Sequence, residues 1–462
     1  MFNRETYQQR RAALVRQTGK GLLVLPGNGD SPSNYTDNIL PFRQDSSFLY
    51  FFGLDLPDLV GVIDLESGEA TLYGDDPGLD AIVWTGPLPT LAAQADGVGV
   101  THSAPLSQLP DRLRTARQTG RTLHLLPQYR PQNRIRLADW LGINLREVDV
   151  LTSPDVTRAV IQLRAVKSLE EIAEIENALA ITKQMHLTAM RMAQPGVTEQ
   201  SIAGAIEGLA WAHGRRQSYA PILSKRGEVL HNHHHDNTLV AGDLLLNDSG
   251  AESPLHYASD ITRTIPVGGR FNDRQRAIYQ TVLDSQLAAI AALKPGVPYL
   301  DIYELSARVL IEGLKPLGLF KGDTDEIIHS GAFALIFPHG LGHMLGLDVH
   351  DMEALNEDWV GYGEGYQRSH DFGRKSLRLA RPVQAGWVVT VEPGIYFIPT
   401  LIDRWQAEDK FTHLINYARF ADFRDFGGVR IEDDILITSD GARVLGDPIA
   451  KSIAEVEACV GH

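Results

Sequence analysis

Residues 244–264 read LLLNDSGAESPLHYASDITRT, and this stretch sets the expectation for the fold of the second half of the chain. The apolar run 244–246 leads to Asp248, and a second acidic residue, Asp260, precedes Ile261. We predict strands over 243–248 and 257–265, because short apolar runs between turn residues are typical of buried strands. The end of such a strand can direct a carboxylate inward, where it is costly unless paired or bound to metal.

Three further segments combine acidic residues or histidines with short apolar runs. They are His339-Gly340-Leu341-Gly342-His343 with its extension to His350, Val391-Glu392-Pro393, and Val429-Arg430-Ile431-Glu432. One acidic residue after a strand is usually a turn residue, but repetition within one region favours a shared site. The first segment lacks the Glu that follows the first histidine of a zincin helix, and its glycines weaken a helix, so we do not interpret it as a zincin motif.

Together these segments predict a metal centre made of Asp248, Asp260, His343, Glu392 and Glu432. Four carboxylates in one pocket could not all stay ionised without cations, and two divalent ions would balance their charge. Oxygen ligands with one imidazole and no thiolate suit Mn, Co or Zn. Two such ions ~3.5–4 Å apart can share a hydroxide nucleophile and stabilise a developing oxyanion.

The periodicity of the whole chain predicts an α+β protein with two domains, residues 1–160 and 161–462. The first alternates helices (4–17, 106–118) with short strands (21–26, 47–52, 59–65, 70–73, 122–126), which indicates a sheet flanked by helices. The second shows helical periodicity over 156–163, 168–192, 199–213, 273–293 and 299–314, and further strands over 387–391 and 429–437. Thr198 is the expected cap of the helix over 199–213. We expect these helices to pack on an antiparallel sheet.

The composition of the chain argues against several classes of protein. The formal net charge of the 462 residues is −15, which argues against a nucleic-acid-binding protein. The sole cysteine, Cys459, cannot form an internal disulfide. The sequence has no apolar run of the ~18 residues that a membrane span needs, and residues 1–5 lack the apolar core of a signal peptide. We therefore expect a cytoplasmic protein that does not associate with membranes.

The five segments resemble the metal motifs of the M24 pita-bread metallopeptidases in order, spacing and flanking residues. Residues 7–11 (YQQRR) and 41–48 (PFRQDSSF) are similar to the N-terminal domain of aminopeptidase P and prolidase, which methionine aminopeptidases lack. The resemblance covers nearly the whole chain. It implies a pita-bread catalytic domain that follows an α/β creatinase/prolidase-like domain.

The same resemblance implies an activity: hydrolysis of the peptide bond that precedes proline, on proline-containing di- or oligopeptides. It also implies a homo-oligomer, with a dimer favoured. Creatinase-like and chaperone-like members of the family keep the fold but lose the metal ligands. Here all five positions carry liganding residue types, so a catalytically silent binding protein is the remote alternative.

Roles for single residues follow from the resemblance. It implies that Asp260 and Glu432 bridge the two metals, that Asp248 completes one coordination shell, and that His343 and Glu392 complete the other. Glu392 is also the implied general base. Residues around the metals are implied to contact the substrate or to orient the ligands: His350, seven residues after His343, then His339, Arg430 and His231.

His231 opens the cluster HNHHH (231–235) and lies 17 residues before Asp248, as the substrate histidine of aminopeptidase P does. For the remaining histidines, 233–235, we prefer a solvated loop, with a weak third metal site as the alternative. Asp248 and Asp260 are twelve positions apart, one more than the family pattern, and the turn over 252–256 accommodates the extra residue.

The metal motifs do not separate prolidase, which cuts Xaa-Pro dipeptides, from aminopeptidase P, which acts on longer Xaa-Pro peptides. Residues 376–381, 391–397 and 426–432 and the insertion over 403–425 resemble eukaryotic-type prolidase, which favours the dipeptidase. Arg378 matches the prolidase arginine that binds the C-terminal carboxylate of the dipeptide, a bidentate task that suits a guanidinium. Without that match, Arg378 would be interpreted as a surface residue of a charged segment.

Overall fold

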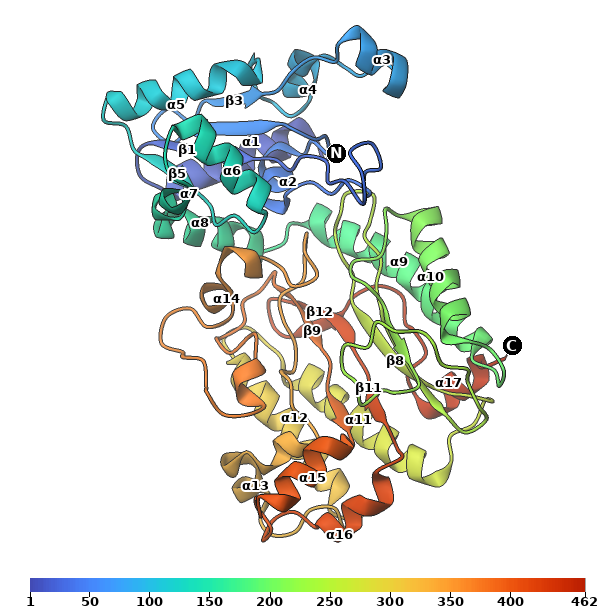
Figure 1. Cartoon of the computed structure of the whole chain (residues 1–462). Helices are drawn as coiled ribbons and strands as arrows, with labels where there is room; N and C mark the ends of the chain where they lie inside the picture. The colour runs from blue at the N-terminus through green and yellow to red at the C-terminus, as the bar shows by residue number, and fades with distance from the viewer. Residues whose placement is uncertain (462) are drawn as a thin grey trace. The chain divides into compact units, whose positions relative to one another are not determined.

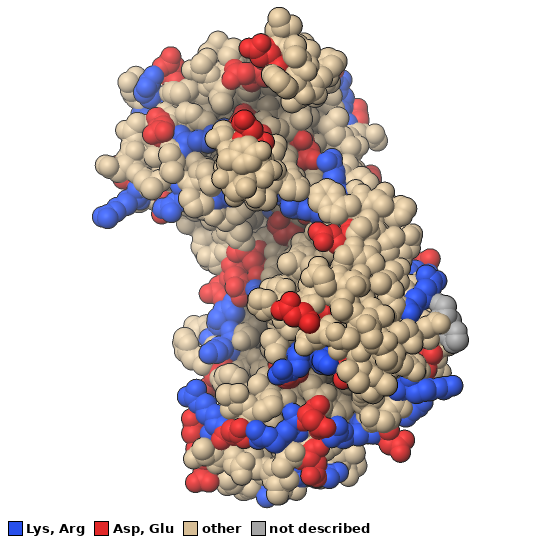
Figure 2. Space-filling view, turned by 45° about the vertical axis from the view of Figure 1, so that its right-hand side comes forward, with Lys and Arg blue, Asp and Glu red and all other residues tan. Residues whose placement is uncertain are grey.

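The computed structural model describes residues 1–461 and divides into two units. The first contains Met1–Arg164 together with Met352–Asn356, and the second contains Ala165–Asp351 and the chain from Glu357 onward. On the face that Figure 2 shows, basic and acidic side chains are interspersed over the surface of each unit. Among the described residues, no helix is both long and apolar enough to cross a membrane.

The first unit is a five-stranded mixed sheet with helices packed against it (Figure 1). The strand order is β4-β3-β2-β1-β5, in which β1 pairs antiparallel with β2 and parallel with β5. The elements are α1 (Arg4–Gln17), β1 (Leu22–Pro26), α2 (Ser46–Phe52), β2 (Val60–Asp64), β3 (Ala70–Tyr73), α3 (Leu79–Thr85), α4 (Leu91–Gly97), β4 (His102–Ala104), α5 (Leu109–Gln118), β5 (Leu123–Leu125), α6 (Pro131–Leu141), α7 (Leu145–Val148) and α8 (Pro154–Ala165).

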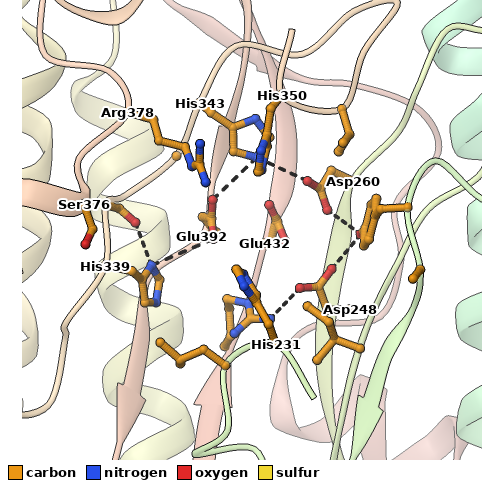
Figure 3. Close-up of a pocket in the computed structure, with 18 of the residues that line it drawn as sticks. His231, Asp248, Asp260, His339, His343, His350, Ser376, Arg378, Glu392 and Glu432 are labelled. Carbon is orange, nitrogen blue, oxygen red and sulfur yellow. Dashed lines mark hydrogen bonds and ion pairs between the residues drawn. The ribbon is translucent and has the colours of Figure 1, made fainter. Parts of the chain in front are cut away.

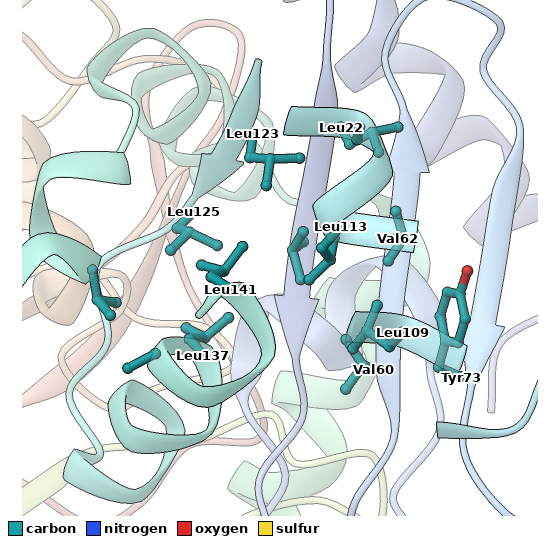
Figure 4. Packing of buried hydrophobic residues seen from close by; sticks show 14 residues of the cluster. Leu22, Val60, Val62, Tyr73, Leu109, Leu113, Leu123, Leu125, Leu137 and Leu141 are labelled. Carbon is teal, nitrogen blue, oxygen red and sulfur yellow. The ribbon is translucent and has the colours of Figure 1, made fainter. Parts of the chain in front are cut away.

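Apolar side chains of this sheet and of α5 and α6 form the core of the first unit (Figure 4). Val24, Val60 and Val62 project from the strands and are fully buried. Leu113 and Leu137 cover them from α5 and α6. The strands predicted over 21–26, 59–65, 70–73 and 122–126 are present, because their alternating or continuous apolar residues fit a sheet that helices cover.

The strand predicted over 47–52 is wrong, since these residues form helix α2. All seven residues of α2 are buried, and an apolar run without polar positions does not distinguish a buried strand from a buried helix. The residues that cap each end of this segment favour the helix. Asp45 accepts a hydrogen bond from the Phe48 N–H (2.9 Å), and Gly53 ends the helix at φ +64° in the left-handed region that favours glycine.

In its described residues, the second unit contains three small antiparallel sheets and long helices, which confirms the predicted α+β class. Its strands are β6 (Ile222–Ser224), β7 (Leu244–Ser249), β8 (Ile261–Pro266), β9 (Val388–Val391), β10 (Gly394–Tyr396), β11 (Gly428–Arg430), β12 (Asp433–Ile437) and β13 (Ala442–Val444). Its helices are α9 (Leu169–Met192), α10 (Glu199–His213), α11 (Asp273–Ala292), α12 (Tyr299–Leu314), α13 (Thr324–Ser330), α15 (Pro399–Ala407), α16 (Tyr417–Phe420) and α17 (Ile453–Cys459). Helix α14 (Glu353–Gly361) begins in the segment assigned to the first unit.

Two local features of this unit bear on the sequence analysis. Thr198 accepts a hydrogen bond from the Ser201 N–H (3.2 Å), which confirms it as the cap of α10. The single strand predicted over 429–437 is instead two strands, β11 and β12, which belong to different sheets. Between them, Ile431 N–H donates to Pro393 and Glu432 N–H to Thr262, so tertiary partners replace a continuous ladder.

Candidate functional site

The second unit contains a cavity of about 610 Å³ into which all five predicted segments project. Its lining brings together segments that are more than two hundred residues apart in sequence (Figure 3). The lining residues are Tyr219, Ala220, Ile222, Leu230, His231, His233, Asp248, Asp260, Pro338, His339, Gly340, Gly342, His343, Val349, His350, Ser376, Arg378, Glu392, Arg430 and Glu432.

Asp248 and Asp260 reach the cavity from the two strands of one hairpin. Asp248 lies in β7 opposite Thr262, and Asp260 immediately precedes β8, so the β7–β8 register brings the two carboxylates together. The Tyr219 hydroxyl lies 2.6 Å from Asp248 Oδ1 and also within hydrogen-bonding distance of Asp260 Oδ1. One phenol therefore orients both carboxylates.

Backbone pairing between the end of β9 and residues 341–343 holds Glu392 and His343 in place. Glu392 directly follows β9, and its N–H donates to the Leu341 carbonyl (2.9 Å). The Thr390 N–H donates to the His343 carbonyl (3.0 Å), so the segment with the two glycines runs beside β9. This pairing explains why the segment is not a helix: its backbone groups bond to a strand.

Glu432 completes the cluster from the break between β11 and β12. A ligand atom from each of Asp260, His343 and Glu432 lies within 4.8 Å of the others, and all three residues are buried. His343 Nε2 is 3.3 Å from Asp260 Oδ2 and 3.7 Å from Glu392 Oε1. These separations suit side chains that converge on a common cation.

The pKa values of the buried carboxyl groups also indicate a site for cations. Burial raises the pKa of Glu392 to about 7. His343 and Arg430 oppose this increase, whereas repulsion from Asp260 and Asp248 adds to it. Burial and the neighbouring carboxylates raise the pKa of Glu432 well above its usual value, and burial raises that of Asp260. The cluster lacks enough positive charge of its own to keep every carboxylate ionised, and its oxygen-rich donor set with one imidazole fits divalent metal ions.

A second layer of hydrogen bonds orients the carboxylates. Arg430 Nη2 is paired with Asp248 Oδ2, and Arg430 Nε donates to the Thr262 hydroxyl (3.1 Å). That hydroxyl donates to Glu432 Oε2 (2.6 Å). Arg430 is 4% exposed, so it is a fixed part of the wall.

His339 is a neutral member of this layer. Its Nδ1 lies 2.7 Å from the Gly340 carbonyl, which can only accept, so Nδ1 carries the proton. The Tyr396 hydroxyl, 2.8 Å away, therefore donates to Nε2. Burial and the nearby Arg430 lower the pKa of His339 to about 3, which keeps the ring uncharged at neutral pH.

His231, His350 and Arg378 line the cavity around the carboxylates (Figure 3). The ring centroids of His350 and His343 are 4.3 Å apart. Burial lowers the pKa of His350 and also that of His231. His233 also lines the cavity, which the sequence analysis did not predict, whereas His235 Nδ1 contacts the Leu223 carbonyl (3.0 Å).

Arg378 has a different environment from the other arginines of its segment. Arg374 is paired with Glu304 (3.0 Å), and the Arg381 guanidinium lies over the Trp387 ring, 4.6 Å from its centroid. Neither of these arginines lines the cavity, but Arg378 does. Its Nη1 is 3.9 Å from Glu357 Oε2, and 33% of its side chain is exposed.

Sequence reasoning missed three contributors to the site. Tyr219 carries no local signal, because it precedes β6 by three residues and lies far from any of the five segments. Tyr396 lies four residues after Glu392 and could have been suspected from that spacing. Asp434 accepts a hydrogen bond from the Asp260 N–H (3.0 Å), and burial raises its pKa well above the usual value.

Comparison with known proteins places these observations in a family. Residues 173–439 match the model of metallopeptidase family M24, and residues 7–124 match the N-terminal domain of aminopeptidase P.

Individual relatives cover almost the whole chain. Human Xaa-Pro dipeptidase is 32% identical over 95% of this chain and 88% of its own length. A probable Xaa-Pro aminopeptidase of Verticillium alfalfae is 33% identical over 96% of this chain and 92% of its own. The structure of Escherichia coli aminopeptidase P with the inhibitor Pro-Leu has a TM-score of 0.81 and 32% identity, and covers 99% of this chain and 98% of that chain.

Proposed function

The chain belongs to metallopeptidase family M24, and from this membership and the geometry of the site we propose that it is an Xaa-Pro peptidase that favours dipeptides. The observation that carries the proposal is the convergence of four carboxylates and His343 in a cavity that Arg378 also lines. Relatives named as Xaa-Pro dipeptidase and as Xaa-Pro aminopeptidase support hydrolysis of the bond that precedes proline.

The proposed cofactor is a pair of divalent metal ions, Mn before Co or Zn. Asp260 and Glu432 would bridge the pair, Asp248 would complete one shell, and His343 and Glu392 the other. The separations within the Asp260, His343 and Glu432 cluster and its raised carboxyl pKa values support this assignment. When bound, two such ions supply a nucleophile at neutral pH and stabilise the charge that develops on the carbonyl oxygen.

Glu392 is the proposed general base. It accepts a proton from the attacking water and delivers it to the proline nitrogen as the peptide bond breaks, so that the carboxylate is regenerated. Its side chain is 19% exposed at the cavity, so water can reach it. Thr390 Oγ1 lies 3.4 Å from Glu392 Oε1 and limits the rotation of the carboxylate.

The histidines act on the substrate. His350 is neutral because burial lowers its pKa, so one ring N–H can donate to the carbonyl oxygen of the scissile bond. His231 enters the cavity from the segment after Leu230 and can contact the substrate on another side. His339 orients the wall through Tyr396 and Arg430 rather than through its own charge.

Arg378 is the proposed determinant of substrate length. A guanidinium that lines the cavity can bind the C-terminal carboxylate of an Xaa-Pro dipeptide through paired hydrogen bonds. Arg378 Nη1 is 3.9 Å from Glu357 Oε2, which is longer than a direct hydrogen bond. A longer peptide has an amide at this position and forms no ion pair there.

The direct test compares hydrolysis of an Xaa-Pro dipeptide with that of an Xaa-Pro-Xaa tripeptide by the Mn-loaded protein. Preference for the dipeptide supports the proposal. Preference for the tripeptide would instead identify an aminopeptidase. Turnover of neither, with metal bound, would favour a catalytically silent binding protein.

We also propose a cytoplasmic homo-oligomer, with a dimer favoured. The sole cysteine, Cys459, is free, so no disulfide requires an oxidising compartment. Helix α3 supports association, because Leu79, Val83 and Trp84 are 77%, 71% and 85% exposed and its residues are not buried within the chain. Light scattering after size-exclusion chromatography should give a dimer mass for wild type and a smaller mass for Trp84→Ser.

A further inference from the structure

A buried ion pair lies next to the site without lining its cavity. Lys167 Nζ is 2.9 Å from Asp351 Oδ2, and the two side chains are 0% and 1% exposed. Desolvation of two charges largely offsets their attraction, so a buried pair is a weak source of stability. Its position beside the metal centre suggests a role in the geometry of the site.

Asp351 closes the loop that carries two site histidines. His343 and His350 lie at either end of this loop, and Asp351 directly follows His350. The Asp351 N–H donates to the Met344 carbonyl (2.9 Å), and Asp351 Oδ1 accepts from the Asp348 N–H (3.3 Å). Asp351 therefore bonds to the beginning of the loop and to a residue two positions before His350.

Lys167 fixes Asp351 to the strands behind the site. The Lys167 N–H donates to the Gly386 carbonyl (2.8 Å), and the Gly386 N–H donates to Ile437 at the end of β12 (2.8 Å). The Lys167 backbone is therefore tied to the sheet of β9 and β12, whose ends adjoin Glu392 and Glu432.

Gly346 leaves room for the pair. A Cβ at this position would lie 2.4 Å from Asp351 Oδ2 and 2.9 Å from Lys167 Cε. The Gly346 carbonyl also accepts from the Ala258 N–H (2.8 Å), two residues before Asp260. The ion pair, the histidine loop and the segment of a proposed metal ligand thus pack against one another.

We propose that the Lys167–Asp351 pair is a positioning device that holds His350 against the substrate. The inference rests on the proposed function, in which His350 contacts the scissile peptide. Lys167 and Asp351 act through His350 and do not touch the substrate themselves. Loss of the pair should therefore lower kcat with little change in KM, because His350 acts on the transition state more than on the bound peptide.

The main test uses Lys167→Met with Asp351→Asn, which removes both charges of the pair together. In the Mn-loaded enzyme, kcat for an Xaa-Pro dipeptide should fall by roughly 10–100-fold, as expected for a catalytic group displaced by about 1 Å. KM and bound metal should stay close to wild type. Adding His350→Ala to this variant should cost little more than His350→Ala alone, because residues that act as one unit are not additive.

Two further variants separate positioning from simple folding. Gly346→Ala keeps both charges but displaces the pair, and it should reproduce the kinetic effect. Arg11→Met is the matched control: Arg11 is a buried cation of the first unit that donates to Phe51 and Val98 (2.7 and 2.8 Å). It should lower the unfolding midpoint and leave kcat unchanged.

NMR of histidine-labelled protein loaded with Zn, which is diamagnetic, provides a readout that does not depend on turnover. The His350 signal, identified by its loss in His350→Ala, should shift in the pair variant and in Gly346→Ala but not in Arg11→Met. Full kcat in the pair variant, an additive effect with His350→Ala, or an unshifted His350 signal would each overturn the proposal. Wild type without activity on any Xaa-Pro peptide would contradict the proposed function alone, since the NMR result still decides the positioning role.

Discussion

The carboxylate wall of the cavity and its substrate-facing side are built in different ways. The wall consists of Asp248, Asp260, Glu392 and Glu432, which lie in strands or directly at their ends and are fixed by β-pairing. The proposed substrate-facing side consists of His231, His350 and Arg378, which line the cavity from segments without regular secondary structure. The rigid region suits chemistry that needs fixed geometry, whereas the loop-borne region can change specificity without disturbing the metal centre.

The largest effect is expected from the proposed bridging carboxylates of the wall. Asp260→Ala and Glu432→Ala should each lose bound metal and peptidase activity together, because each removes a ligand from both ions. Elemental analysis and turnover should be measured on the same samples. Full metal occupancy in both variants would show that these residues are not the ligands.

The proposed general base should give the next largest effect. Glu392→Gln keeps the size of the side chain and removes its basicity, so kcat should fall by roughly 10²–10⁴-fold. Partial metal loss should accompany the fall, because Glu392 is also a proposed ligand. Turnover should be normalised to bound metal, and a normalised kcat close to wild type would place the base elsewhere.

Arg378→Ala tests the substrate-facing side and should leave the wall intact. The variant should lose roughly 10–200-fold in kcat/KM on an Xaa-Pro dipeptide, since a charge-assisted hydrogen bond contributes about 1.5–3 kcal/mol. The Xaa-Pro-Xaa tripeptide should be little affected, and bound metal should not change. Arg374→Ala, an arginine of the same segment outside the cavity lining, is the control. Equal losses on both substrates would make Arg378 a structural residue.

The smallest effect is expected on the unfolding free energy of the metal-stripped protein. The pKa of Glu392 is raised to about 7 in the folded chain, so the folded state binds more protons than the unfolded state between the ordinary carboxyl pKa and that value. The unfolding free energy of metal-stripped protein should therefore decrease as pH rises from about 4.5 to about 7.

Glu392→Gln should weaken this pH dependence, and metal loading should suppress it, because bound cations stabilise the ionised carboxylates. Urea denaturation at several pH values, with and without Mn, measures both. A stability of the stripped wild type that rises over this interval would contradict the assignment.

The contrast between wall and loops also explains how far the sequence could predict the site. The acidic residues of the wall follow apolar runs, and that pattern is local, so Asp248, Asp260, Glu392 and Glu432 were identifiable before the structure. His231 and Arg378 were identifiable only through resemblance to a family, since their local sequence equally fits a solvated loop or a charged surface. The structure adds that Arg378 lines the cavity whereas Arg374 and Arg381 do not.

The sequence by itself determined the α+β class, the long helices such as α9 to α12, and the residue types of the proposed metal centre. These depend on periodicity, caps and strand ends, which are encoded within a few neighbouring residues.

Only the tertiary structure decided that 46–52 is a helix, that β11 and β12 are separate strands, that Tyr219 contacts Asp248, and that Lys167 pairs with Asp351. Each of these depends on partners distant in sequence: Lys167 and Asp351 are 184 residues apart. Local propensity carries no information about such partners, because the free energy that selects them comes from packing and hydrogen bonds formed only in the folded chain.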